Sequence, residues 1–128
     1  MAVLEVIDDV LDDLQRFYTS GNFPLILKKI GQIERNPLQT GLPLGGNLAT
    51  FRKITFGKRN WRIIFRTTPD GQNVSIWVIG DRDDMECYEL AKQRVAALGD
   101  NPHRQTIEQA IELFDRERAK KRDDAEPA

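Results

Sequence analysis

The sequence predicts an α+β fold in which an N-terminal helical hairpin packs on a small antiparallel β-sheet and C-terminal helices follow. Apolar residues recur every three or four positions before residue 36, which is the period of amphipathic helices. From 49 to 79 the pattern changes to segments rich in β-branched and aromatic residues, which is typical of strands. A helical period returns after residue 83. The length of 128 residues suits a single domain with its own core.

Two amphipathic helices are predicted near the N-terminus, after a short strand at Val3–Val6. The apolar face of the first helix comprises Ile7, Val10, Leu11, Leu14, Phe17 and Tyr18. That of the second comprises Phe23, Ile26, Leu27, Ile30 and Ile33. The sequence Ser20-Gly21-Asn22 separates them, and Asn36-Pro37 ends the second because the residue before proline avoids the α region. Two helices joined by so short a turn form a hairpin.

Three strands are predicted next, at Thr50–Phe56, Trp61–Thr67 and Asn73–Ile79. The connections between them are short, which implies an antiparallel meander. Side chains alternate along a strand, so the middle strand has one apolar side and one mixed side. The apolar side carries Trp61, Ile63 and Phe65, and the mixed side carries Arg62, Ile64 and Arg66. The mixed side is where charge can be displayed.

A third helix is expected to begin at Asp83 or Asp84, with Glu86 placed as in a capping box. Its apolar positions are Tyr88, Ala91, Val95 and Leu98, and we expect it to pack on the sheet.

Asn101-Pro102 predicts the start of a last helix, because Asn is a good N-cap and Pro is tolerated at the first helical position. Its apolar stripe is narrow: Ile107, Ala110, Ile111 and Phe114. We expect a single domain over 1–122, in which 102–122 is an additional C-terminal helix, and a disordered tail over 123–128. This helix either covers the hydrophobic side of the domain, which we favour, or contacts a partner protein or a second copy.

The composition indicates a soluble cytoplasmic protein. No apolar run approaches the length of a membrane span, and the N-terminus lacks the basic and apolar regions of an export signal. Cys87 is the single cysteine, so no internal disulfide can form. We expect no membrane association.

Positive charge is concentrated in one part of the chain, although the net charge is only −1. No Asp or Glu occurs between Arg35 and Pro69. The cations of this stretch are Arg35, Arg52, Lys53, Lys58, Arg59, Arg62 and Arg66. Such a local excess can attract phosphate even in a nearly neutral molecule.

Familiar catalytic and cofactor signals are missing, so we expect neither a cofactor nor a metal. His103, the one histidine, is predicted to be a solvated residue near a helix cap. The glycines at 41, 45 and 46 lack the lysine and helix of a phosphate-binding loop. The acidic cluster Asp81, Asp83, Asp84 and Glu86 is explained more simply by helix capping than by metal binding.

Four residues form the candidate catalytic set. Lys53 and Arg62 fall on neighbouring strands, Arg82 just after the third strand and Tyr88 one turn into the next helix. Three cations near one phosphate suit RNA cleavage by the substrate's own 2′-hydroxyl, because the protein then only orients the attack and stabilises the developing charge. The alternative is that these cations decorate a solvated sheet face. The other cations expected to bind RNA are Arg52, Lys58, Arg59 and Arg66.

The same residues carry a resemblance to RelE-like toxins of the RelE/ParE toxin superfamily, which belong to bacterial type II toxin–antitoxin pairs. The resembling runs are Leu48–Ile54, Trp61–Phe65, Trp77–Asp83 and Glu86–Tyr88. They combine a strand with Arg-Lys, an aromatic-Arg strand, and Gly-x-Arg followed six residues later by Tyr. The resemblance covers about 42–95, and the order of elements extends it to most of the chain.

The resemblance implies a ribosome-dependent endoribonuclease, an mRNA interferase that inhibits translation. Lys53 would support the reaction, Arg62 and Arg82 would hold or protonate around the scissile phosphate, and Tyr88 would stack on or orient the nucleotide. The implied partners are a cognate antitoxin, the ribosome and messenger RNA. We expect a toxin–antitoxin hetero-oligomer or a homodimer.

One position departs from the family pattern. Two residues after Lys53, on the same strand face, well-known members have a second lysine, whereas this chain has Thr55. Lys58 or Arg59 would have to compensate for the missing charge. The alternative function is a non-enzymatic binding module on the same fold, either a ParE-like gyrase inhibitor or an inactive toxin relic.

Overall fold

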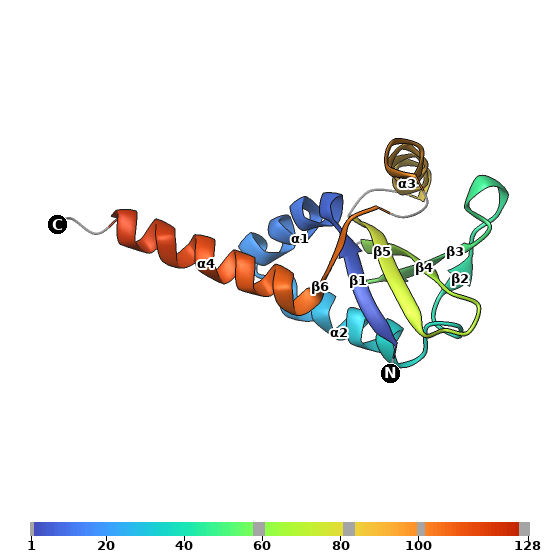
Figure 1. Ribbon diagram of the computed structural model, residues 1–128, viewed down its shortest axis with the longest axis horizontal. Coiled ribbons are helices and arrows are strands. Elements are labelled where there is room, and N and C mark those ends of the chain that lie inside the picture. Colours follow the sequence, from blue (N-terminus) through green and yellow to red (C-terminus); the bar gives the residue numbers. More distant parts are fainter. Residues whose placement is uncertain (1, 58–60, 81–83, 100–101, 126–128) are drawn as a thin grey trace.

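A twisted six-stranded sheet forms the centre of the computed structural model, which describes residues 2–57, 61–80, 84–99 and 102–125 (Figure 1). The strand order is β2-β3-β4-β5-β1-β6. In chain order the strands are β1 (Val3–Ile7), β2 (Leu42–Pro43), β3 (Phe51–Phe56), β4 (Trp61–Thr67), β5 (Asn73–Gly80) and β6 (Arg104–Thr106). The predicted α+β class is confirmed.

The N-terminal hairpin consists of α1 (Asp8–Ser20) and α2 (Phe23–Arg35), which lie together on one side of the sheet (Figure 1). Gly21 ends α1 in the left-handed conformation, with φ of 82°, which glycine adopts without strain. The ring of Phe17 contacts that of Trp61 edge-on, with 5.4 Å between the ring centroids. The apolar side of β4 therefore lies under the hairpin, as the alternation in the sequence predicts.

The meander of β3, β4 and β5 is antiparallel, as predicted, but the sheet as a whole is mixed. β1 runs parallel to β5, with Val3 opposite Asn73 and Val6 opposite Ile76. The hairpin and the meander together provide the long connection that a parallel pair requires. Local alternation predicts that β1 is a strand, but it cannot show which strand lies beside it.

The pairing of β1 with β5 ends at Ile76. Beyond it, side chains from two helices form hydrogen bonds with the backbone of β5. The backbone N–H of Ile79 donates to Asp13 Oδ2 at 3.0 Å, and Arg94 Nη1 donates to the carbonyl of Trp77 at 2.8 Å. Arg94 also donates to both carboxylate oxygens of Asp13, at 2.8 and 3.2 Å. Asp13 is 2% exposed. This pair joins α1 to α3 (Asp84–Leu98), which packs against β4 and β5.

The expected helix start at Asn101-Pro102 is wrong. Residues 104–106 instead form β6, which pairs antiparallel with β1, and α4 (Ile107–Ala125) begins after it. Thr106 and Gln109 form a reciprocal capping box: Thr106 N donates to Gln109 Oε1 at 2.9 Å, and Gln109 N donates to Thr106 Oγ1 at 3.2 Å. This Thr-x-x-Gln signal satisfies the first turn better than a proline start does, because it supplies two hydrogen bonds.

The first turns of α4 cover the core with Ile107, Ala110 and Phe114, as expected for this helix. Its later turns extend away from the body of the molecule (Figure 1). The helix runs to Ala125, past residue 122, where we expected a tail to begin. Within the described ranges, no helix is long and apolar enough to cross a membrane.

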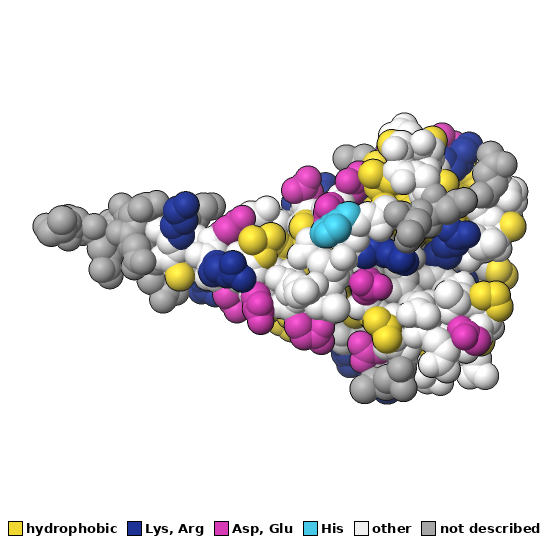
Figure 2. Space-filling model, in the orientation of Figure 1, with side chains coloured by type: hydrophobic (Ala, Val, Ile, Leu, Met, Phe, Trp, Pro, Cys, Tyr) yellow, Lys and Arg dark blue, Asp and Glu magenta, His cyan; other side chains and the backbone are white. Residues whose placement is uncertain are grey.

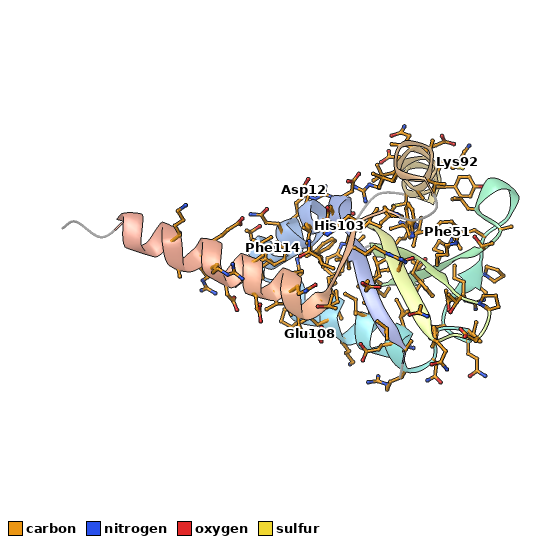
Figure 3. All side chains as sticks on the ribbon, viewed as in Figure 1. Asp12, Phe51, Lys92, His103, Glu108 and Phe114 are labelled. Carbon is orange, nitrogen blue, oxygen red and sulfur yellow. The ribbon has the colours of Figure 1, made fainter. Side chains whose placement is uncertain are left out.

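We predict that Asp13→Ala lowers the free energy of unfolding by about 3–5 kcal/mol, because it removes the buried ion-pair partner of Arg94 and leaves it only the more distant, half-exposed Asp9, 3.7 Å from Arg94 Nε. Asp12→Ala is the matched control: Asp12 is exposed on the same helix (Figure 3), and its loss should change stability by less than about 0.5 kcal/mol. Urea denaturation measures both. Equal losses in the two variants would contradict the assigned role of Asp13.

Candidate functional site

Lys53 and Arg62 lie on the same face of the sheet, opposite the side covered by the α1–α2 hairpin. In the register of β3 and β4, Lys53 lies opposite Ile64 and Thr55 opposite Arg62. Residues directly opposite in an antiparallel pair point to the same side, so Lys53 and Arg62 are diagonal neighbours. Their Cβ atoms are expected about 7–8 Å apart or less, within reach of one phosphate for two long side chains. We call this the Lys53–Arg62 face.

The backbone at Lys53 is fixed by the close approach of Gly41. A Cβ on Gly41 would collide with the Lys53 carbonyl oxygen, and Gly41 has φ of 73°, which favours glycine. Leu42, the next residue, pairs with Lys53 across β2 and β3. The local sequence thus positions the main chain from which the Lys53 side chain projects.

Tyr88 lies on α3 and connects this helix to the loop before β3. Its hydroxyl donates to the carbonyl of Gly45 at 2.9 Å, and the ring is half-buried. Lys92 Nζ lies 5.5 Å from the centre of the Tyr88 ring, at cation–π distance. Figure 3 shows Lys92 projecting from α3 at the end of the molecule where Phe51 also lies. Tyr88 therefore positions a loop, with its hydroxyl proton engaged.

Arg66 shares the Lys53–Arg62 face, four residues further along β4, which is two repeats of the pleat. It lies opposite Phe51 in the register, and its guanidinium carbon is 5.4 Å from the centre of the Phe51 ring. Cation–π contact of this kind orients the guanidinium over the sheet.

Arg52 does not share this face with the other cations. Its register partner is Phe65, and its guanidinium donates to the carbonyls of Thr40 and Gly41, both at 2.9 Å. These bonds fasten the loop after α2 to β3. At least two of its donors therefore serve the structure, and its role in RNA binding stays a prediction.

The remaining predicted site residues, Arg82, Lys58 and Arg59, lie outside the described residues. Within the described part of the chain, no group of three His, Cys, Asp or Glu side chains could bind a metal ion. His103 is exposed, as predicted, and its Nδ1 lies 3.0 Å from Asp8 Oδ1.

Arg104 borders the same face of the sheet but was not singled out in the sequence, because 102–106 was assigned to a helix. It lies on β6 opposite Ile7. The capping-box residues Thr106 and Gln109 are the signal that could have placed Arg104 before the helix, on an extended segment. Figure 2 shows Lys and Arg side chains over the sheet, to the right of the histidine, whereas many Asp and Glu side chains lie on the helical side.

Comparisons with known proteins identify the fold. No protein-family model matches the sequence, and no curated protein matches it. Among solved structures, the chain is similar to a free-state mutant of the E. coli toxin RelE in which two arginines are replaced by alanine. The TM-score is 0.60 and the identity 19%, over 74% of this chain and 99% of that chain. The two proteins share an architecture despite their low identity, and this chain has the fold of the RelE-like toxins.

Proposed function

We propose that this protein is the toxin of a type II toxin–antitoxin system and acts as a ribosome-dependent endoribonuclease on messenger RNA. The observation that carries the proposal is the Lys53–Arg62 face: two cations on adjacent strands of a RelE-like fold, on the side not covered by the α1–α2 hairpin. A cytoplasmic location follows from this role, because ribosomes and messenger RNA are its partners.

The proposed reaction depends on positive charge near the phosphate and on the orientation of the attacking 2′-oxygen, and it does not require a histidine. The RNA 2′-oxygen attacks the adjacent phosphorus and loses its proton, while the bond from phosphorus to the 5′-oxygen breaks and that oxygen gains a proton. The products are a 2′,3′-cyclic phosphate or 3′-phosphate end and a 5′-hydroxyl end. Positive side chains accelerate such a step by stabilising the negative charge that grows on the phosphate oxygens.

The residues of the candidate catalytic set receive the following proposed roles. Arg62 is the proposed phosphate clamp, because a guanidinium can donate two parallel hydrogen bonds to phosphate oxygens. Lys53 is the proposed second charge at the same phosphate. Tyr88 is the proposed positioning residue, since its bond to Gly45 orders the loop that leads into β3. Arg82 is proposed to act with Arg62 on the resemblance alone.

The proposed partner in the resting cell is a cognate antitoxin. A basic face that binds phosphate is also complementary to an acidic protein segment, so the antitoxin is expected to cover the Lys53–Arg62 face and block RNA. The toxin and antitoxin would then form a hetero-oligomer.

The proposal predicts that expression without antitoxin arrests growth and that transcripts are cut only when ribosomes are present. Arg62→Ala and Lys53→Ala should each lower the cleavage rate by about 100-fold or more, the usual cost of removing one transition-state donor. Mapped transcript ends on programmed ribosomes measure the rate. Arg35→Ala is the control, because Arg35 is exposed at the end of α2.

Three other outcomes would reject the nuclease proposal. Growth arrest with DNA damage and intact transcripts would indicate a gyrase-directed toxin. Normal growth with abundant folded wild-type protein would indicate an inactive relic. Full cleavage by both Arg62→Ala and Lys53→Ala would show that the reaction occurs elsewhere on the molecule.

Thr55 provides a gain-of-function test, because it is exposed and lies directly opposite Arg62. Thr55→Lys should raise the single-turnover cleavage rate by about tenfold, since it adds a positive charge to a site whose barrier depends on charge stabilisation. Thr55→Gln, a neutral residue of intermediate length, is the matched control and should leave the rate near the wild-type value. A Thr55→Lys rate no higher than the Thr55→Gln rate would contradict this role of the position.

A further inference from the structure

A polar hollow lies on the same face of the sheet as Lys53 and Arg62, toward the other end of β4. Its volume is about 370 Å³. Residues that line it include Thr50, Arg66, Thr67, Thr68, Ser75 and Arg104. Two arginines and four hydroxyl-bearing residues thus line one concave site. No carboxylate occurs among the described residues that line it.

The two arginines reach this hollow from distant parts of the chain. Arg66 projects from β4, whereas Arg104 projects from β6, and β5 and β1 lie between these strands. Three strand spacings separate β4 from β6 by roughly 14 Å, so the long side chains approach the hollow from opposite sides. β6 therefore brings a C-terminal cation to the face that carries Lys53 and Arg62.

Ser75 supplies a buried hydroxyl group at the hollow. It is 5% exposed and lies opposite Arg66 in the register of β4 and β5. The indole N–H of Trp77 donates to Ser75 Oγ at 3.0 Å. Because a serine hydroxyl can accept and donate at once, this bond leaves the Ser75 hydrogen for an acceptor. The fixed hydroxyl suits an acceptor-rich ligand such as phosphate.

The turn at the edge of the hollow is also fixed. The Thr68 hydroxyl donates to Asp70 Oδ1 at 2.6 Å, and the backbone N–H of Gln72 donates to the same oxygen at 3.0 Å. These two bonds favour the ionised carboxylate and lower the pKa of Asp70. The edge of the hollow is therefore ordered by local bonds.

We propose that the hollow between Arg66 and Arg104 binds a second phosphate of the RNA strand, beyond the scissile phosphate at Arg62. This inference rests on the proposed function, because it takes RNA as the ligand. It adds Arg104 and Ser75 to the binding surface and gives β6 a part in it. The site positions the strand and has no chemical step of its own.

Continuity with the Lys53–Arg62 face favours RNA over an acidic peptide. Arg62 and Arg66 are four residues apart on β4, which corresponds to roughly 13 Å along the strand. An RNA backbone presents phosphates at regular intervals, so one strand can bind both positions. Glu5 lies on the same face, beside Ser75 and Thr106 in the register, and offsets part of the arginine charge. The hollow is therefore expected to bind one phosphate of the strand and to attract other anions only weakly.

The test measures binding of a short fluorescent RNA whose 2′-hydroxyls are methylated, so that it cannot be cleaved. The full-length protein is titrated with this RNA at several salt concentrations. Arg104→Gln and Arg66→Gln should each weaken binding by about tenfold and reduce the slope of log K against log salt by about 0.7, the value for one phosphate contact on single-stranded RNA. Arg35→Gln removes the same charge from the end of α2 and should change neither quantity.

Thermal melting of each variant checks that the sheet is intact, because Arg104 belongs to the short strand β6. Arg66→Gln acts from the central strand β4 and tests the same site without touching β6. RNA affinity and salt slope unchanged in folded Arg66→Gln and Arg104→Gln would overturn the inference. Equal losses for the RNA and for a poly-glutamate peptide of the same charge would also overturn it, in favour of a protein contact.

These experiments can reject either proposal without rejecting the other. If Arg62→Ala abolishes cleavage while Arg104→Gln keeps the wild-type RNA affinity and salt slope, the second phosphate site is wrong and the nuclease proposal stands. If Arg104→Gln loses RNA affinity and salt slope as expected but no variant affects transcripts, RNA binding stands and the nuclease proposal fails.

Discussion

The hydrogen bonds of Asp13 with β5 and Arg94 are the constraint on which the arrangement of the helices and the sheet depends. β5 extends beyond its partner β1, and its exposed peptide groups need other donors and acceptors. Asp13 accepts from Ile79, and Arg94 donates to Trp77 and to Asp13 itself. A buried carboxylate is tolerated here because both of its oxygens accept hydrogen bonds, from Arg94 and from the Ile79 N–H. One ion pair thus fixes α1, α3 and the end of β5 together.

The candidate site depends on this arrangement through α3. Because Arg94 fixes the position of α3, Tyr88 lies where its hydroxyl can reach Gly45. That bond orders the loop before β3, and Gly41 fixes the backbone of β3 at Lys53. The positions of the cations on the face are therefore set by interactions outside it. A change at Asp13 is expected to reach the site through α3 rather than through the charge of the face.

Periodicity predicted the helical hairpin and the meander because each element has one clear apolar side. It predicted which side of β4 carries Arg62, because side chains alternate strictly along a strand. It could not predict the parallel pairing of β1 with β5, since partner choice depends on the whole topology. Asp13 also escaped notice, because an acid on an amphipathic helix is usually solvated. The structural bonds of Arg52 could not be predicted for a related reason: a basic stretch does not reveal that two carbonyls engage one of its arginines.

The distribution of charge explains how a chain with net charge −1 can present a basic surface. The meander separates its cations by alternation, so Lys53, Arg62 and Arg66 point to one face while Arg52 points to the other. The acidic residues lie mainly in the helices, which keeps them away from that part of the sheet. Screening over about 8–10 Å limits their influence at physiological salt. A phosphate near the sheet therefore experiences the local cations more strongly than the net charge, and Glu5, on the same face, moderates them.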